Sequence, residues 1–152
     1  MNKKIVSWEE YRQSSPLPHY VDSTENLVVI YNDKEIRISG KCLFPSSDPT
    51  LKPREHANHF HVVMLIDVVE TLNVLWNASR VAKSFLGFSQ MLSIETNSRI
   101  TEKFVLDTSY RFEVQATKGT HDFWNVELKI YNSDGKVIAT VECKAYCPRP
   151  QD

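Results

Sequence analysis

A polar stripe runs along an otherwise apolar stretch of the sequence. Asp67, Glu70 and Asn77, with Asn73 less well aligned, recur at spacings of three to four residues, which places them on one face of a helix. A carboxylate on a buried helix loses hydration, and this raises its pKa towards the range in which a general acid or base works near neutral pH. We interpret Glu70 as a candidate catalytic residue, and Asp67 and Asn77 as candidate substrate contacts.

These carboxylates also have a purely structural interpretation. Asp67 or Glu70 could pair with Arg80, with Arg99 or with a lysine at the helix surface, and such an ion pair would serve packing rather than chemistry. The sequence leaves both interpretations open.

Three histidines, His56, His59 and His61, gather just before the stripe. Alternating histidines can bind a metal, but a catalytic site also needs a third ligand and an open position, and the chain has no HExxH helix pair. We expect no metal and no cofactor. Nucleophilic catalysis has little support, because the chain lacks a GxSxG elbow and no cysteine lies near the histidines in sequence.

The stripe lies in a long segment that starts at Asn58, contains no Gly or Pro, and is apolar around most of its circumference. A helix of this kind is buried or spans a membrane. We expect no membrane span, because Asp67 and Glu70 would lie in its middle, and a span needs about 18–20 residues nearly free of charge. The pattern predicts an enclosed central helix over 59–86, with Asn58 as N-cap and Gly87 as its stop.

Helix geometry limits how these groups can meet. His59 and Glu70 are separated by about 16 Å along a helix that rises 1.5 Å per residue. They cannot meet within one chain unless His59 folds back sharply, but they can meet across a two-fold dimer with antiparallel helices. Free N–H groups at the N-terminus of this helix can also stabilise a developing oxyanion or enolate.

Strand patterns flank the helix on both sides. Asn32-Asp33 and the run Asn132-Ser133-Asp134-Gly135 are turn signals between alternating segments. Residues 1–20 form an N-terminal segment, in which we expect a short helix over residues 1–12, with Ser7 capping the turns at 8–12. The expected strands are 26–31, 35–44, 90–100, 110–117, 123–131 and 137–147.

Size and composition limit the class of protein. At 152 residues the chain is expected to be a single α+β domain, an antiparallel sheet of about six strands wrapped around one long central helix. A net charge of −1 with both signs mixed predicts no nucleic-acid partner. The three cysteines, Cys42, Cys143 and Cys147, show no CxxC spacing and no secretion signal precedes them, so we expect reduced thiols in a cytoplasmic protein.

This layout resembles the hotdog fold. The residues at the start of the predicted helix resemble those of one family with this fold. Residues 58–64, NHFHVVM, resemble the Gly-His-Phe-Asn-x-Val-Glu run that begins the central helix of the FcoT-type long-chain acyl-CoA thioesterases. The upstream hairpin, the helix length and the stretch NSRI at 97–100 fall in comparable places. The resemblance covers residues 20–147 and implies a hotdog homodimer or higher oligomer. It also implies acyl chains carried as thioesters of coenzyme A or an acyl carrier protein.

The chain departs from that family at its site. Where the family helix carries Asn-Gln, this chain reads Glu70-Thr71, and residues 45–58 lack the family's loop tyrosine. Tyr11 corresponds to an earlier family tyrosine and is expected at the substrate, as is Asn58. His59 holds the family's His-Phe position and is expected to be catalytic together with Glu70.

A second hotdog family is also similar in part. β-Hydroxyacyl-ACP dehydratases place a histidine near one helix entrance and an acidic residue on the partner's helix, as His59 and Glu70 would lie here. Three hypotheses follow. The first is a thioesterase releasing a fatty or polyketide-type acyl chain, and the second is a dehydratase or isomerase. The third is a hotdog protein that binds an acyl carrier without catalysis.

Overall fold

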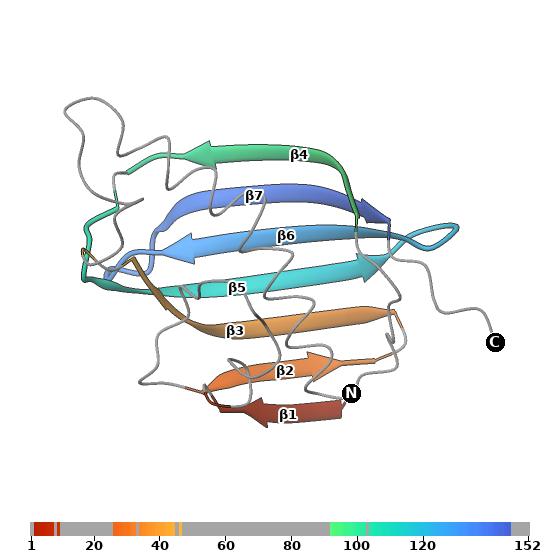
Figure 1. Ribbon diagram of the computed structural model, residues 1–152, viewed down its shortest axis with the longest axis horizontal. Helices are drawn as coiled ribbons and strands as arrows, with labels where there is room; N and C mark the ends of the chain where they lie inside the picture. The colour runs from red at the N-terminus through yellow and green to blue at the C-terminus, as the bar shows by residue number, and fades with distance from the viewer. Residues whose placement is uncertain are drawn as a thin grey trace.

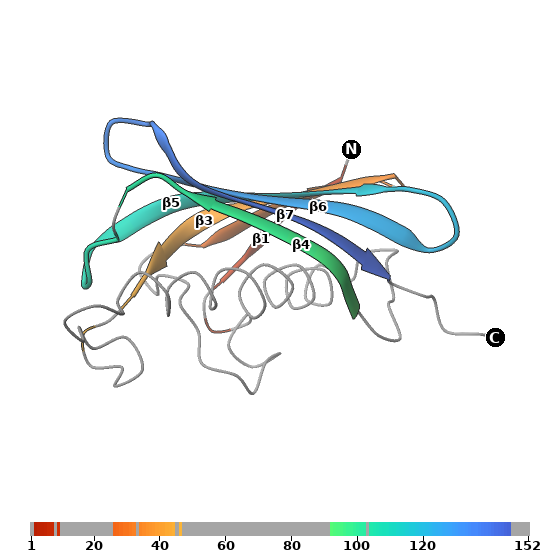
Figure 2. The same ribbon diagram turned by 90° about the horizontal axis from the view of Figure 1, so that it is seen from above.

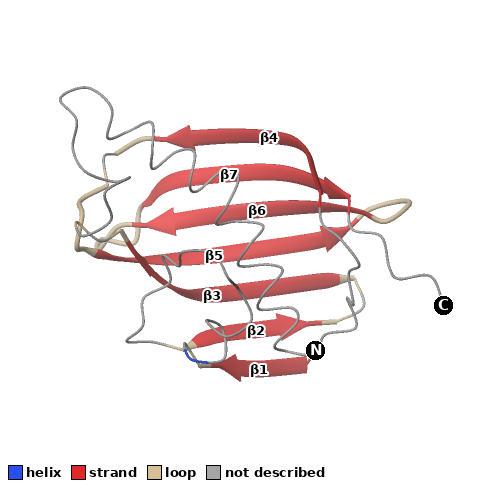
Figure 3. Ribbon diagram, viewed as in Figure 1, coloured by secondary structure: helices blue, strands red, loops and turns tan. Residues whose placement is uncertain are grey.

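The computed structural model describes the strands and their connecting turns. The described residues are 2–7, 9, 26–32, 34–44, 46, 92–102 and 104–146. The predicted central helix, 59–86, lies outside these ranges, as does most of the N-terminal segment 1–20. Figure 3 shows that the described part of the chain is built almost entirely of strands, turns and loops.

Seven strands form a single sheet (Figure 1). Every neighbouring pair in it is antiparallel. The strands are β1 (Asn2–Val6), β2 (Leu27–Tyr31), β3 (Glu35–Leu43), β4 (Leu92–Ile100), β5 (Ser109–Lys118), β6 (Phe123–Tyr131) and β7 (Val137–Tyr146).

The strand order is β1-β2-β3-β5-β6-β7-β4, so β4 alone lies out of its place in the sequence order. After β3 the chain reaches the opposite edge of the sheet, forms β4 beside β7, and returns to place β5 against β3. Three strands therefore separate β3 from β4. Seen from above, the sheet is twisted and curved, as antiparallel sheets that enclose a core are (Figure 2).

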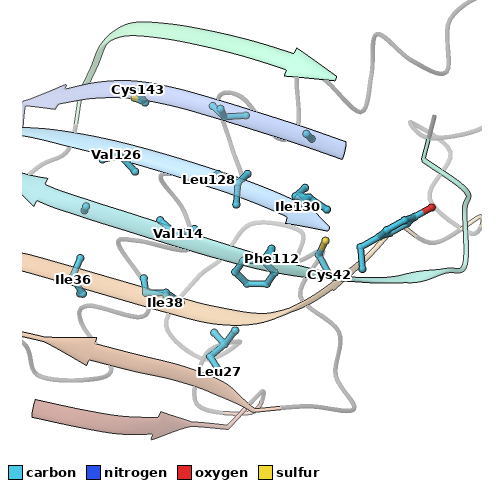
Figure 4. Packing of buried hydrophobic residues seen from close by; sticks show 14 of the residues in the cluster. Leu27, Ile36, Ile38, Cys42, Phe112, Val114, Val126, Leu128, Ile130 and Cys143 are labelled. Atoms are coloured by element: carbon cyan, nitrogen blue, oxygen red, sulfur yellow. The ribbon is translucent and has the colours of Figure 1, made fainter. Parts of the chain in front are cut away.

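One face of the sheet is buried and the other is exposed, and the alternation predicted from the sequence produces this. In β5 the even-numbered residues from Tyr110 to Ala116 are buried, while their neighbours are exposed. β6 alternates in the same way, with Trp124, Val126, Leu128 and Ile130 on the buried face. Figure 4 shows several of these side chains pointing to one side of the sheet, together with Ile36, Ile38 and Phe112. Burial of such side chains stabilises a fold by about 1.5–3 kcal/mol each.

Asparagine side chains form two of the turns as predicted. Asn32 Oδ1 accepts hydrogen bonds from the N–H groups of Lys34 and Glu35, both at 2.9 Å. Asn132 Oδ1 does the same for Asp134 at 3.0 Å and Lys136 at 2.9 Å. Gly135, with φ of 79°, takes the left-handed conformation that the second turn requires.

Two expectations were wrong. Residues Asn2–Val6 form strand β1 instead of the start of a helix, because they pair with β2 along their full length and end in β-branched Ile5 and Val6. The sheet therefore has seven strands, one more than predicted. At the start of β7, Ile138 and Ala139 are both buried, since a register shift beside Ile130 breaks the expected alternation.

Candidate functional site

The residues that the sequence singles out for chemistry lie outside the described part of the chain. This holds for the expected catalytic pair, Glu70 and His59, and for Asn58, Asp67, Asn77 and Tyr11. Their geometry therefore stays a prediction. What the structure does show is the sheet against which such a site would be built.

The buried face of that sheet is apolar. Among the described residues that are fully buried, only Cys42, Cys143 and Tyr110 carry an ionisable group. Cys42 and Cys143 are both buried. A wall of this composition suits an acyl chain or a protein core, but it offers no carboxylate or imidazole for proton transfer. Acid–base groups for a reaction at this face must come from another part of the protein.

Two hydrogen bonds hold the chain in place just after the end of β3. The connection that leads towards His56, His59 and His61 starts here. Asp107 Oδ1 accepts a hydrogen bond from the Ser46 N–H at 2.9 Å, and the Asp107 N–H donates to the Phe44 carbonyl at 2.8 Å. Asp107 adopts a left-handed φ of 60°, which aspartate tolerates better than most residues. Hydrogen bonding by Ser46 lowers the pKa of the Asp107 carboxyl below its ordinary value of 3.8.

Three aromatic rings pack beside this anchor. The Phe44 and Phe104 centroids are 5.4 Å apart, and the Phe104 and Tyr110 centroids are 5.2 Å apart, both edge to face. The Tyr110 hydroxyl accepts a hydrogen bond from the Val105 N–H at 2.8 Å. The cluster fixes the loop between β4 and β5 onto the end of β3. Sequence analysis missed this anchor, although a short polar break before β5 (Asp107-Thr108) was a signal for it.

The exposed face carries a groove of about 510 Å³ across four strands. In register, Glu127 on β6 lies directly opposite Glu142 on β7, and Lys144 lies opposite Glu95 on β4. The groove is lined by Glu95, Asn97, Gln115, Thr117, Asn125, Val126, Glu127, Glu142, Cys143 and Lys144.

Charged contacts on this face are ordinary surface interactions. Lys129 Nζ lies 3.3 Å from Glu127, and this pairing raises the lysine pKa. Burial raises the pKa of the Tyr131 hydroxyl, and its 3.0 Å hydrogen bond to Glu113 adds to the shift. Arg111 stacks over the Tyr131 ring at 4.7 Å. Water screens exposed charges placed like these, so each contact contributes little to stability.

The described residues contain no group of three His, Cys, Asp or Glu side chains placed to bind a metal ion. Nor do they contain a helix long and apolar enough to cross a membrane.

Comparison with known proteins rests on structure. No protein-family profile matches the chain, and no curated protein matches it. The protein yhdA of Lactococcus lactis, described as a thioesterase, is similar with a TM-score of 0.58 and 10% identity, over 82% of this chain and 91% of that one. A Streptococcus pneumoniae protein, described as a thioesterase and solved with coenzyme A, has a TM-score of 0.52 and 10% identity, over 96% and 100% of the chains.

The dehydratase heterocomplex ApeI:P of Xenorhabdus doucetiae is also similar, with a TM-score of 0.50 and 15% identity over 80% of each chain. The fold is the hotdog fold. Identities this low establish architecture and leave activity open, since one fold hosts many functions. The described sheet is thus a hotdog sheet, and several of the similar structures are described as thioesterases.

Proposed function

We propose that the protein is an acyl-thioester hydrolase that releases a fatty or polyketide-type acyl chain from coenzyme A or an acyl carrier protein. The observation that carries the proposal is the likeness of this sheet to structures described as thioesterases, one of them solved with coenzyme A. The apolar buried face supports it, because an acyl chain needs an apolar wall. The FcoT-type resemblance of residues 58–64 points the same way.

Glu70 is the proposed general base. Its carboxylate takes a proton from water as the hydroxyl forms a bond to the thioester carbonyl carbon. The C–S bond then breaks, and Glu70 returns its proton to the departing thiolate, so that the thiol and the free acid are released. N–H groups at the start of the predicted helix, capped by Asn58, stabilise the oxyanion. In a cytoplasmic homodimer, His59 of one chain acts together with Glu70 of the other chain. Asp67, Asn77 and Tyr11 contact the substrate.

Dehydration of a β-hydroxyacyl thioester is the second candidate. The similarity to a dehydratase complex favours it, together with the pairing of His59 and Glu70 across a dimer. In this reaction the base removes a proton next to the carbonyl, and the acid protonates the leaving hydroxyl. The third candidate, an acyl-carrier-binding protein without catalysis, rests on the departures at Glu70-Thr71 and in residues 45–58.

Mass spectrometry of acyl-CoA and 3-hydroxyacyl-CoA after incubation with the protein distinguishes the candidates. We expect free acid and free CoA, and a loss of at least about 100-fold in rate for Glu70→Gln, since general bases typically contribute 10²–10⁴-fold. Glu113→Gln, which changes an exposed carboxylate of β5, is the matched control and should retain full rate. Loss of one water from the 3-hydroxy substrate alone would assign a dehydratase. No turnover of CoA or carrier-protein thioesters would refute both enzyme hypotheses.

A further inference from the structure

Among the described residues, one hydroxyl group is fully buried. It belongs to Tyr110, the first inward-facing residue of β5, which is 7% exposed and lies opposite Cys42 of β3 in register. Phe112 is the next residue of β5 on this face, and Figure 4 shows it close to Cys42. The other fully buried side chains of the described chain include no serine, threonine or second tyrosine.

The Tyr110 hydroxyl forms one hydrogen bond, and it is the acceptor in that bond. The Val105 N–H donates to its oxygen at 2.8 Å. The part of the chain that the structure describes provides no acceptor for the hydroxyl hydrogen. A buried tyrosine hydroxyl usually has a partner, because a buried donor without an acceptor destabilises the fold. The hydrogen is therefore available to a group that this part of the chain does not supply.

The hydroxyl is also held in a fixed position. The Phe104 ring packs edge to face on the Tyr110 ring, with centroids 5.2 Å apart, and the bond from Val105 fixes the oxygen. A donor held in this way needs no reorganisation when a ligand arrives, and this makes it effective in stabilising charge on the ligand.

The position of the hydroxyl suits one atom of an acyl thioester. Tyr110 is the second residue of β5, so it lies at one end of the apolar face, beside the Asp107–Ser46 contact from which the chain leads towards His59. An acyl chain lying along this face would have its carbonyl oxygen as its first polar atom. That oxygen accepts hydrogen bonds and has no proton of its own, so it needs a donor at the end of the apolar wall.

We propose that Tyr110 is a catalytic residue whose hydroxyl donates a hydrogen bond to the carbonyl oxygen of the bound acyl thioester. As water adds to the carbonyl carbon this oxygen becomes an oxyanion, and the hydrogen bond to it strengthens. Tyr110 keeps its proton throughout, and the charge leaves the oxygen when the C–S bond breaks. In dehydration the same oxygen becomes an enolate. The assignment thus rests on the acyl-thioester substrate of the proposed function, but not on which reaction follows.

Kinetics of Tyr110→Phe test the role in catalysis. This substitution removes the hydroxyl and keeps the ring that packs on Phe104. We expect kcat for acyl-CoA hydrolysis to fall by about 100-fold, as it does on loss of one oxyanion donor, with little change in KM. Because the variant also loses the contact with Val105, rates are compared at a temperature where circular dichroism shows both proteins folded.

Tyr131→Phe is the matched control. It removes a hydroxyl from the exposed face, where Tyr131 donates a 3.0 Å hydrogen bond to Glu113. This variant should retain the full rate. Equal losses of kcat in the two variants would contradict a specific role for Tyr110.

Two unreactive coenzyme A analogues test the hydrogen bond without hydrolysis. In the ketone analogue a methylene group separates the sulfur from the carbonyl, and the alkyl analogue has the same chain without a carbonyl. By isothermal titration calorimetry, we expect Tyr110→Phe to raise the Kd of the ketone by about 3- to 10-fold, the usual effect of one hydrogen bond. The Kd of the alkyl analogue should not change, and Tyr131→Phe should alter neither value.

A purely structural Tyr110 predicts a different result, in which Tyr110→Phe weakens the binding of both analogues equally or of neither. Either result, or an unmodified protein that binds neither analogue, overturns the proposal. The expected discrimination in a protein that hydrolyses no thioester would refute the proposed hydrolysis and leave the role of Tyr110 intact. If Tyr110→Phe does not fold, 3-fluorotyrosine at position 110 decides the matter, since it keeps the oxygen that Val105 contacts and donates a stronger hydrogen bond. It should lower the Kd of the ketone alone, and an unchanged Kd would overturn the proposal.

Discussion

Asp107 shows how one exposed residue can position a distant segment. It hydrogen-bonds Ser46 across 61 residues of sequence and so holds the end of β3 to the loop that precedes β5. The chain that continues from Ser46 leads to His59 and the predicted helix, so this anchor sets where that chain begins. Because the carboxylate is the acceptor, the contact depends on its charge.

The Asp107 contact should therefore weaken in acid. Hydrogen bonding lowers the pKa of this carboxyl in the folded protein, so its contribution to stability is present above the unfolded value of about 3.9 and is lost as the pH falls through the lower folded value. We expect Asp107→Asn to have a lower Tm than the unmodified protein at pH 7, and the difference to shrink as the pH falls below about 3.8. Thermal unfolding across this pH range measures it.

The matched control is Asp134→Asn, which removes one exposed negative charge from the turn between β6 and β7. If both substitutions gave the same change of Tm at every pH, net charge and not the contact with Ser46 would account for the effect. A Tm difference for Asp107→Asn that did not shrink as the pH fell below 3.8 would also contradict the assignment.

At the scale of elements, the hairpin of β6 and β7 depends on a turn that contains a residue in the left-handed conformation. Gly135 has a φ of 79° with open space around its α-carbon, so an added methyl group meets no neighbour but strains the backbone. We expect Gly135→Ala to lower the free energy of unfolding by about 1 kcal/mol, the usual penalty for placing a residue with a Cβ in this conformation. Denaturant titration gives the value.

Ser133→Ala is the control in the same turn and should change the free energy of unfolding by less than about 0.5 kcal/mol, as exposed substitutions usually do. Equal effects of the two substitutions would mean that the left-handed conformation of Gly135 is not what specifies the turn. A shift in the denaturant slope for Gly135→Ala would point to a change in the denatured state.

The elements differ in how far the sequence determined them. Phe123–Tyr131 was predicted to the residue, because strict alternation and an Asn-Ser-Asp-Gly turn specify a hairpin locally. Asn2–Val6 was not, because so short a segment becomes a strand only through pairing with β2, which local sequence cannot reveal. The contact between Asp107 and Ser46 was missed for the same reason. The predicted site residues, from Tyr11 to Asn77, lie outside the described residues and stay predictions.

At the scale of the whole molecule, the homodimer of the proposed function would make stability depend on concentration. If a dimer unfolds to two separate chains, each tenfold rise in protein concentration favours the folded state by about 1.4 kcal/mol per dimer. Two chains of 152 residues unfold with an entropy of roughly 0.6 kcal/mol/K, so Tm should rise by about 2 °C per tenfold. Calorimetry or fluorescence from 1 to 100 µM, about 4 °C in total, would detect this. A Tm that stayed constant over this range would mean that unfolding does not involve dissociation, which would contradict the proposed homodimer.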